Sequence, residues 1–304
     1  MELQIENLSK RYPNGTQALQ QVSLNIPQGM FGLLGPNGAG KSTLMRTLAT
    51  LQEADSGRVA LGDVDVLRQK DTVRRMLGYL PQEFGLYPKV SAEDLLAHFA
   101  VLKGISNARE RRDSVQALLQ QTNLYDHRRK PLGSFSGGMK QRFGIAQALL
   151  GNPKLIIVDE PTAGLDPEER VRFHNLLSAI GQNIIVILST HIVSDVSDLC
   201  QAMAIIHEGR VRVAGNPTAL VAEMNGKVWK KSIAHGELAS YRERLQLISM
   251  RLFAGRTLIH VLSDLQPETG FEPTAPDLED LYFATVKGFA HQGSAHRPSP
   301  GPVN

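Results

Sequence analysis

The sequence holds a single cysteine, Cys200, among 304 residues. One cysteine cannot form a disulfide within the chain, and this favours a reducing compartment. Cys200 stands in a mixed apolar run, which is typical of a small buried residue rather than a nucleophile. The sequence also lacks any grouping of cysteine with histidine that has the spacing of metal ligands. A disulfide scaffold and a thiolate metal site are therefore excluded.

Long hydrophobic runs are missing as well. The longest, at 155–158 and 184–188, are far too short to span a bilayer. The first six residues alternate polar and apolar side chains and lack the apolar core of a signal peptide. If this protein works at a membrane, we expect it to lie on the surface.

The chain carries little excess charge. Its formal net charge is +3, so bulk electrostatics indicate neither a nucleic-acid partner nor an anionic membrane. Local basic groups at 109–112 and 127–130 are simplest to interpret as solvated helix ends and turns. The apolar fraction of 42% is enough for a real core. The length fits one large domain with a small one, or two domains.

The most informative stretch has the pattern G-x-x-x-x-G-K-[ST]. It follows an apolar run at 30–34 and precedes a helix-forming run at 42–51, which is the context the motif requires. Glycines let successive backbone N–H groups surround phosphate oxygens, while the lysine and the helix start add positive charge. We therefore predict nucleoside triphosphate binding. The residues concerned are Gly35, Pro36, Asn37, Gly38, Ala39, Gly40, Lys41, Ser42 and Thr43.

Two carboxylates follow a fully apolar run. Asp159 and Glu160 come directly after 155–158, at the strand edge where α/β sheets bind ligands. One of them, Asp159, can hold Mg²⁺ together with the Ser42 hydroxyl. The other, Glu160, can polarise an attacking water as a general base.

Periodicity predicts an α/β protein with a mostly parallel sheet, because strands and helices alternate over most of the chain. A capping pattern from Ser91 to Asp94 opens a helix with the apolar stripe Leu95, Leu96, Phe99 and Leu102. The first predicted strand contains Leu3 and Ile5. Further predicted strands lie at 18–26, 30–34, 58–61, 76–80, 154–158, 183–188, 202–207, 227–233, 247–252 and 257–262. Predicted helices lie at 42–51, 91–102, 108–121, 136–150, 167–180, 192–199 and 277–286.

The same pattern suggests the domain organisation. Residues 2–225 form the first domain, with an antiparallel β subdomain at its start and a helical insertion at about 88–132. Residues 226–286 form a small α+β domain. The segment 287–304 is rich in glycine, serine, histidine and proline, and we expect it to be disordered.

Several further motifs occur in one order along the chain. The sequences FSGGMKQR at 135–142, YLPQ at 79–82, GLDP at 164–167 and STH at 189–191 follow the phosphate loop or interleave with the carboxylates. Together they resemble the signature, Q-loop, D-loop and H-switch of ATP-binding-cassette (ABC) ATPases. The resemblance covers roughly residues 2–225 and implies a P-loop NTPase fold of ABC type. Its implied ligands are ATP and Mg²⁺.

The resemblance also implies that the site is shared between two chains. Ser136, Gly137 and Gly138 would begin a helix whose positive end meets the γ-phosphate bound by the other subunit. Asp166 would cross that interface. Two chains, identical or paralogous, would pack head-to-tail around two ATP molecules.

Three side chains gain individual roles from the resemblance. His191 would contact the γ-phosphate, and Gln82 would reach Mg²⁺ or the attacking water. Tyr12 stands where the family stacks an aromatic ring on adenine. The signature departs from the common form at Phe135 and Met139, and we expect both side chains to pack rather than touch phosphate.

The kind of ABC ATPase can also be narrowed. A single cassette and a short helical insertion argue against soluble relatives with paired cassettes or long coiled coils. The aromatic segment 83–88 resembles the groove that receives a membrane subunit, although an ordinary packed loop is the alternative. The sequence APDLEDLYF at 275–283 is similar to the terminal motif of drug- and antibiotic-exporting ABC ATPases.

Our interpretation is an ATP-hydrolysing subunit that powers export by separate transmembrane subunits. It would lie on the cytoplasmic face of the cell membrane, with no nucleic-acid partner expected. One alternative is a soluble ABC ATPase that acts as a mechanical switch on a protein or nucleic-acid complex. Another is a regulatory subunit that binds ATP and barely hydrolyses it. The sequence does not specify the cargo.

Overall fold

A computed structural model describes residues 1–82, 85–253 and 255–289. The chain divides into two compact units, Met1–Val211 and Arg212–Asn304. The division falls inside strand β10 (Arg210–Gly215). The sequence boundary at 225–226 stays a prediction, and the predicted disordered tail lies outside the described residues from position 290 onward. Within the described ranges, no helix combines the length and the apolar character needed to cross a bilayer.

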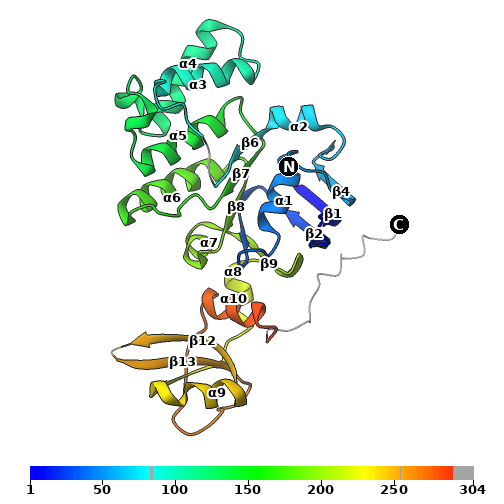
Figure 1. The fold of residues 1–304 in the computed structure, drawn as a ribbon, viewed down its shortest axis with the longest axis vertical. Coiled ribbons are helices and arrows are strands. Elements are labelled where there is room, and N and C mark those ends of the chain that lie inside the picture. Colours follow the sequence, from blue (N-terminus) through cyan, green and yellow to red (C-terminus); the bar gives the residue numbers. More distant parts are fainter. Residues whose placement is uncertain (83–84, 254, 290–304) are drawn as a thin grey trace, which may run out of the picture. The chain divides into compact units, whose positions relative to one another are not determined.

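A six-stranded sheet forms the centre of the first unit, in the order β10-β9-β3-β8-β7-β6 (Figure 1). Strands β3, β8, β7, β6 and β9 pair in parallel. Every residue of β7 and β8 is buried, as expected for a parallel sheet covered on both faces. The bounds are β3 (Gly29–Leu34), β6 (Leu77–Leu80), β7 (Leu155–Asp159), β8 (Ile185–Thr190) and β9 (Ala202–His207).

The first unit also contains an antiparallel sheet of order β2-β1-β4-β5. Its strands lie before β3 and directly after α1 (Lys41–Leu48) in the chain. It confirms the predicted β subdomain. Its strands are β1 (Leu3–Arg11), β2 (Gln17–Ile26), β4 (Ser56–Leu61) and β5 (Val64–Asp65). Strands β1 and β2 form a hairpin, in whose turn the Tyr12 amide donates to the Thr16 carbonyl.

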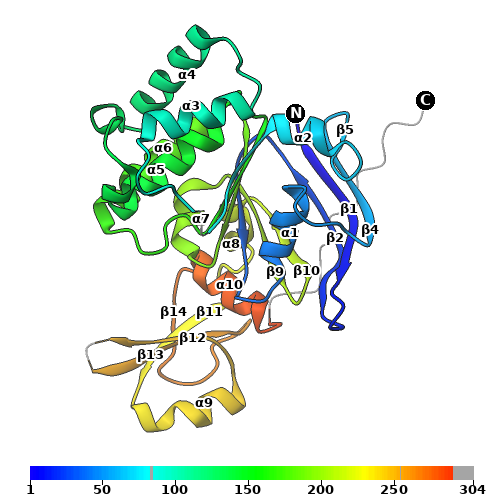
Figure 2. The ribbon, with the colours of Figure 1, turned by 45° about the horizontal axis from the view of Figure 1, so that its top comes forward.

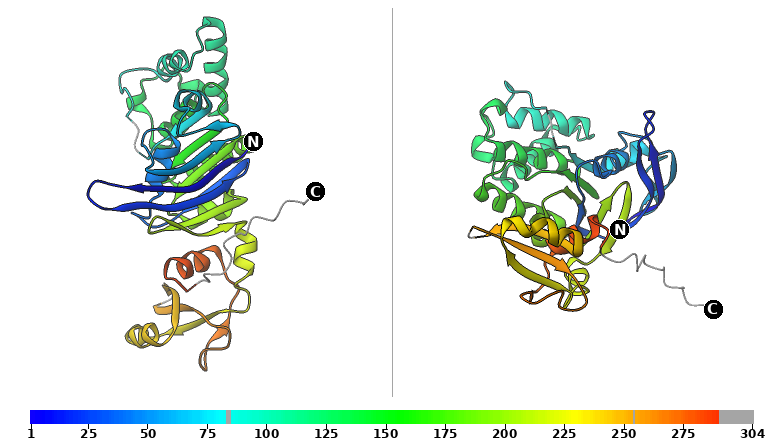
Figure 3. Two further views of the ribbon diagram at one scale, coloured as in Figure 1. Left: turned by 90° about the vertical axis from the view of Figure 1, so that its right-hand side faces the viewer. Right: turned by 60° about the horizontal axis from the view of Figure 1, so that its bottom comes forward.

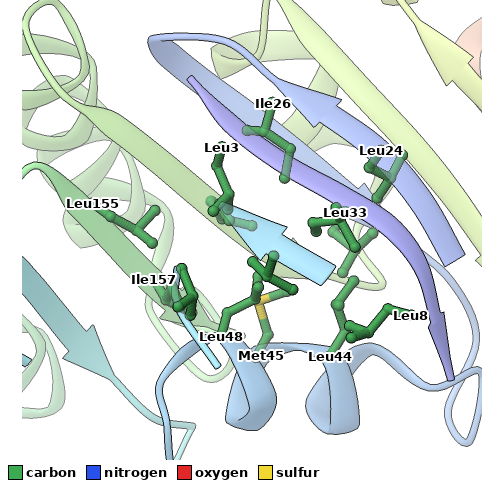
Figure 4. Packing of buried hydrophobic residues seen from close by; sticks show 14 of the residues in the cluster. Leu3, Leu8, Leu24, Ile26, Leu33, Leu44, Met45, Leu48, Leu155 and Ile157 are labelled. Atoms are coloured by element: carbon green, nitrogen blue, oxygen red, sulfur yellow. The ribbon is translucent and has the colours of Figure 1, made fainter. Parts of the chain in front are cut away.

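Helix α1 (Lys41–Leu48) lies between the two sheets (Figure 2). Its buried residues Leu44, Met45 and Leu48 face the antiparallel strands on one side and the parallel core on the other (Figure 4). Because the interior is close-packed, truncating one of the two leucines to alanine would cost about 2–5 kcal/mol. This packing fixes the start of α1, and with it the end of the phosphate loop.

The helical insertion is confirmed. Helices α3 (Ala92–Leu102) and α4 (Ala108–Gln121) share one apolar cluster with α5 (Gly137–Leu149) (Figures 1 and 2). Ser91 caps α3 by accepting a hydrogen bond from the Asp94 amide. The predicted apolar stripe is wrong at one position. Leu102, the last residue of α3, is 70% exposed, since the last buried residue of this helix is Ala100.

Helices α6 (Pro167–Gly181) and α7 (Val193–Leu199) pack on the core sheet and on each other. A side chain at Gly32 of β3 would collide with Val196 of α7, so glycine permits this close approach. The chain that enters each of these helices comes from the carboxyl end of a core strand, β7 for α6 and β8 for α7.

The second unit is a small α+β domain. Its strands pair antiparallel in the order β12-β13-β11-β14, as predicted for the three longer ones. Helices α9 and α10 lie on opposite sides of this sheet (Figure 3). Tyr241 of α9 packs with Phe271, while Asp280 of α10 contacts His260 of β13. The bounds are β11 (Val228–Ile233), α9 (Leu238–Arg244), β12 (Gln246–Phe253), β13 (Arg256–Leu262), β14 (Glu272–Pro273) and α10 (Leu278–Val286).

Several short elements were not predicted. They have too few residues to show a period, or they lie next to stronger patterns that dominate the window. They are β5, α2 (Lys70–Met76), β10, α8 (Pro217–Ala222), α9, β14 and the short turns of 3₁₀-helix η1 (Tyr125–His127), η2 (Leu132–Ser134) and η3 (His235–Glu237).

Candidate nucleotide site

Strand register brings the sequence motifs together at one edge of the core sheet. Leu34, the last residue of β3, pairs with Thr190 of β8, and Asp159 of β7 pairs with Ser189. The phosphate loop, the two carboxylates and His191 therefore follow the ends of three adjacent parallel strands. This edge is where α/β sheets bind their ligands.

The phosphate loop depends on glycine at two close approaches. Gly40 has φ +107°, and a side chain there would also collide with the Ala18 carbonyl. A side chain at Gly35 would collide with the Ile206 carbonyl, although its backbone is unstrained. Glycine is the residue that tolerates both demands. The loop can therefore run close to the neighbouring backbone and direct its N–H groups at a ligand.

A pocket of about 850 Å³ opens over this loop. Its lining combines the loop with polar groups from the ends of the neighbouring strands and with residues of the β1–β2 hairpin. Residues that line it are Tyr12, Thr16, Gln17, Ala18, Gln20, Pro36, Asn37, Gly38, Gly40, Lys41, Ser42, Thr43, Gln82, Glu160, Ala163, His191 and Glu208.

Lys41 is held on the loop that precedes it. Its Nζ donates to the carbonyl oxygens of Gly35 (2.6 Å) and Pro36 (3.2 Å), and lies 3.8 Å from a carboxylate oxygen of Glu160. Burial lowers the pKa of Lys41, while the charges of Glu160 and Asp159 raise it by less. A polyanion entering the pocket would meet a partly desolvated ammonium group, whose attraction for phosphate is stronger than in water.

Glu160 sits in a backbone conformation that is unusual for its type. Its φ is +49°, and its amide donates to the Ser189 carbonyl of the neighbouring strand. The carboxylate is 11% exposed and lies 2.9 Å from Nδ1 of His191. Sparsely populated backbone conformations cluster at functional sites, where the surrounding structure holds them in place.

Asp159 differs from its neighbour. It is 5% exposed, and among the described residues its Oδ1 has no hydrogen-bond partner. Burial raises the pKa of Asp159, with the Ser189 hydroxyl and the Lys41 charge opposing the change. A buried carboxylate oxygen without a partner is a suitable ligand for a hard cation, so the residues present fit Mg²⁺.

Tyr12 forms one wall of the pocket. Its hydroxyl lies 3.1 Å from the Thr43 hydroxyl and donates to the side-chain oxygen of Gln52 at 3.0 Å. The ring is thereby fixed to α1 and to the segment that follows it. A fixed aromatic ring beside a phosphate loop provides a flat surface on which a base can stack.

The signature residues lie elsewhere in the first unit. Ser136 caps α5 by accepting from the Met139 amide, and Asp166 caps α6 by accepting from the Glu169 amide. Neither the glycines at 137 and 138 nor these two caps belong to the pocket lining. The signature residues of this chain therefore lie outside the pocket that its phosphate loop lines.

Comparison with known proteins agrees with the motifs. The "ABC transporter" family profile matches residues 19–163. The uncharacterized ABC transporter ATP-binding protein YxlF of Bacillus subtilis is 32% identical over 303 residues, covering 93% of this chain and 99% of YxlF. The chain belongs to the ABC transporter ATPase family. It is thus an ATP-binding and ATP-hydrolysing subunit of an ABC transporter, and the non-transport alternative has no support among these relatives.

Other ABC relatives are similar over much of the chain. The daunorubicin/doxorubicin resistance ATP-binding protein DrrA of Streptomyces peucetius is 34% identical, covering 80% of this chain and 74% of DrrA. Among solved structures, cbiO1 from Clostridium perfringens has a TM-score of 0.66 and 31% identity, over 73% of this chain and 90% of its own. The dimeric cassette MJ0796, solved in a post-hydrolysis state with ADP and phosphate, has a TM-score of 0.64 and 26% identity, over 70% of this chain and 98% of its own.

Most of the predicted ABC site residues share the pocket. The predicted residues that do not line it are Gly35, Ala39, Asp159, Asp166 and the signature residues Ser136, Gly137 and Gly138. The predicted packing of the two signature departures is confirmed, since Phe135 is buried and Met139 packs against the same cluster. The pocket wall contributed by Thr16, Gln17, Ala18, Gln20, Ala163 and Glu208 was not predicted, because these residues belong to no motif.

Proposed function

We propose that this chain hydrolyses Mg²⁺-bound ATP in a head-to-tail dimer and thereby powers an exporter. One observation carries the proposal. The phosphate loop, Glu160 and His191 share one pocket, whereas the signature helix of the same chain does not line it. A second copy, or a paralogous chain, would supply the missing positive helix end.

In this proposal each residue of the pocket has one task. Lys41 and the loop amides hold the β- and γ-phosphates, and the Tyr12 ring supports adenine. Ser42, Gln82 and Asp159 would hold Mg²⁺, which neutralises developing phosphate charge when bound. Our support for the ion is the unpartnered buried oxygen of Asp159.

The chemical step assigned to this chain is proton transfer. A water oxygen attacks the γ-phosphorus, the bond to the bridging oxygen breaks, and ADP and inorganic phosphate result. Glu160 accepts the proton that the water loses, a role that fits a largely buried carboxylate beside the phosphate loop. His191, 2.9 Å from that carboxylate, orients it and contacts the γ-phosphate.

Export is supported by the relatives. DrrA is named for resistance to daunorubicin and doxorubicin, and LnrL of Bacillus subtilis, 32% identical over 226 residues, is named for resistance to linearmycin. The terminal motif at 275–283 forms a capped helix, in which Asp277 and Asp280 complete a reciprocal capping box. These observations favour an organic export cargo, bound by other subunits.

The membrane partner would dock beside the Q-loop, at the cytoplasmic face. Of the aromatic segment at 83–88, positions 83 and 84 lie outside the described residues. Tyr87 is 63% exposed, while the Pro88 carbonyl accepts from the Gly133 amide. A large exposed ring on a segment tied to the insertion suits a protein contact. We expect no nucleic-acid partner.

The test uses the Glu160→Gln variant, tagged and purified from its native membranes with ATP and Mg²⁺. We expect hydrolysis to fall by about 10²- to 10⁴-fold, since a general base contributes that much. ATP binding should persist, and the closed dimer should accumulate. A polytopic membrane protein should purify with it in stoichiometric amount.

Two results would contradict the proposal. Hydrolysis at the parental rate would remove the general-base role from Glu160. Copurification with ribosomes, DNA or a soluble complex in place of a membrane protein would contradict the transport role. Lys41→Ala is the control, because it should weaken ATP binding itself and leave the dimer open.

A further inference from the structure

A buried carboxylate links the segments that follow the two proposed catalytic groups. Asp195 of α7 is 0% exposed. Its Oδ2 accepts from the Thr162 hydroxyl at 2.6 Å. Its Oδ1 accepts from Nε and Nη2 of Arg170, at 2.9 and 2.6 Å, and lies 2.9 Å from Nε2 of His174. Four hydrogen-bonding contacts thus converge on one side chain.

The partners come from separate parts of the first unit. Thr162 is buried in the turn two residues after Glu160, just before the D-loop. Arg170 and His174 lie on α6, the helix that the D-loop enters. Asp195 lies four residues after His191, on α7. The cluster therefore joins the chain segments that lead away from Glu160, from the D-loop and from His191.

Burying a carboxylate is unfavourable unless it is paired and hydrogen-bonded. Apolar residues could fill the space between α6 and α7 without that desolvation cost. A fully buried Asp195 with every observed partner in place instead gives directional bonds, which fix the relative position of the two helices and the turn. Such directional restraint is useful where geometry matters more than stability.

A second contact, in the pocket, joins the same two chain segments. The carboxylate of Glu160 lies 2.9 Å from His191. Thr162, two residues after Glu160, donates to Asp195, four residues after His191. The two segments are therefore cross-linked twice. If the hydrogen bond between Thr162 and Asp195 is lost, only the contact between Glu160 and His191 still joins the two segments.

We infer that Asp195 is a positioning residue for ATP hydrolysis. Through Thr162 it sets the position of Glu160 relative to His191, and through Arg170 it ties both to the start of α6. This inference rests on the proposed roles of Glu160 and His191. It assigns Asp195 no contact with nucleotide, and the described residues that line the pocket do not include it.

The test variant is Thr162→Val, which removes one hydroxyl and keeps the shape of the side chain. We expect kcat for ATP to fall about tenfold to a hundredfold, because a small misplacement of a reacting group has an effect of that size. The Kd for ATP, measured directly, should stay within about twofold of the parent, because the phosphate loop is untouched. Thr162→Ser, which restores the hydroxyl, should recover most of the loss.

The control variant is Thr122→Val. Thr122 is also buried and donates its hydroxyl to the Leu118 carbonyl, but it lies in the helical insertion. The Thr122→Val variant loses a similar buried hydrogen bond and should keep the parental kcat. Asp195→Asn, which keeps the shape but removes the charge that meets Arg170, is the second test variant. It should show the same loss of kcat with unchanged Kd.

The inference is overturned if Thr162→Val keeps kcat as Thr122→Val does, or if kcat and ATP affinity fall together. Glu160→Gln is assayed in the same series. If that variant hydrolyses ATP normally, the proposed general base is wrong. If Glu160→Gln is inactive but Thr162→Val shows no fall in kcat at unchanged Kd, the general base is retained and only the positioning role is wrong.

Discussion

The phosphate-loop face and the signature face of the first unit handle their polar groups in opposite ways. On the phosphate-loop face, the charged groups of Lys41 and Glu160 lie 3.8 Å apart, and an oxygen of Asp159 is buried without a hydrogen-bond partner among the described residues. On the signature face, Ser136 and Asp166 already accept hydrogen bonds from their own helices. The phosphate-loop face thus has an unpartnered carboxylate oxygen, whereas the two helix caps of the signature face are already hydrogen-bonded.

The difference indicates what the signature face can offer a partner. Helix α5 begins at Gly137, and the first amides of a helix have no carbonyl partner within it. Because Ser136 satisfies the Met139 amide, the amides of Gly137 and Gly138 are the groups left for a ligand. The signature would therefore contribute backbone dipoles, which suit a phosphate that arrives on another chain.

The largest effect should come from removing the unmet charge on the phosphate-loop face. In Asp159→Asn we expect hydrolysis to fall at least a hundredfold and the nucleotide-free protein to become more stable. Burial raises the pKa of Asp159, so ionisation is easier in the unfolded chain, and the fold is destabilised at every pH above the unfolded value. The gain should be about 1–3 kcal/mol at neutral pH, and it should vanish near pH 4 and below. Thermal unfolding at several pH values measures it.

The matched control is Asp195→Asn. That carboxylate is equally buried but fully partnered, so its replacement should destabilise the protein. If Asp159→Asn also lowers the unfolding temperature at pH 7, the oxygen of Asp159 has a stabilising role within the chain. The contrast between the two faces would then be weaker than the structure indicates.

The second effect concerns the glycines of the signature. For Gly137→Ala we expect hydrolysis to fall by at least tenfold with unchanged or slightly raised stability. Apart from its chain neighbours and the adjoining backbone of α5, no described atom lies within 4 Å of a side chain added at Gly137, so the methyl group meets no packing clash within its own chain. Alanine also lowers the entropy of the unfolded chain. Phosphate release and nucleotide-free thermal unfolding, measured together, separate the two properties.

Gly138→Ala provides the comparison. A side chain there would collide with the carboxylate of Glu169, which pairs with Arg142, so this variant should lose stability through overpacking. Parental hydrolysis in Gly137→Ala would show that the signature helix end does not meet a nucleotide. The head-to-tail dimer would then need another interface.

The sequence was sufficient for the long elements and for the local motifs. The helix predicted at 108–121 and the strand predicted at 202–207 have those bounds, because period and capping signals are strong there. The pocket residues within motifs were predicted for the same reason. Nothing in the spacing of Thr162, Arg170, His174 and Asp195 indicates that they meet, since packing of α6 on α7 decides it. The hairpin wall at 16–20 likewise depends on how two sheets pack.

The smallest effect should come from the signature cap. Ser136→Ala and Ser91→Ala each remove a serine that caps a helix by accepting one amide hydrogen bond. Each should cost about 1 kcal/mol, or roughly 2–4 °C in the unfolding temperature of a domain of this size. Only Ser136→Ala should also slow hydrolysis, by a few fold, because its helix end is the one that would meet ATP. Equal slowing in both variants would mean that lost stability causes the change. Slowing in Ser136→Ala alone would show that the start of α5 contributes to hydrolysis beyond its effect on stability, as expected if it meets the nucleotide bound by the partner.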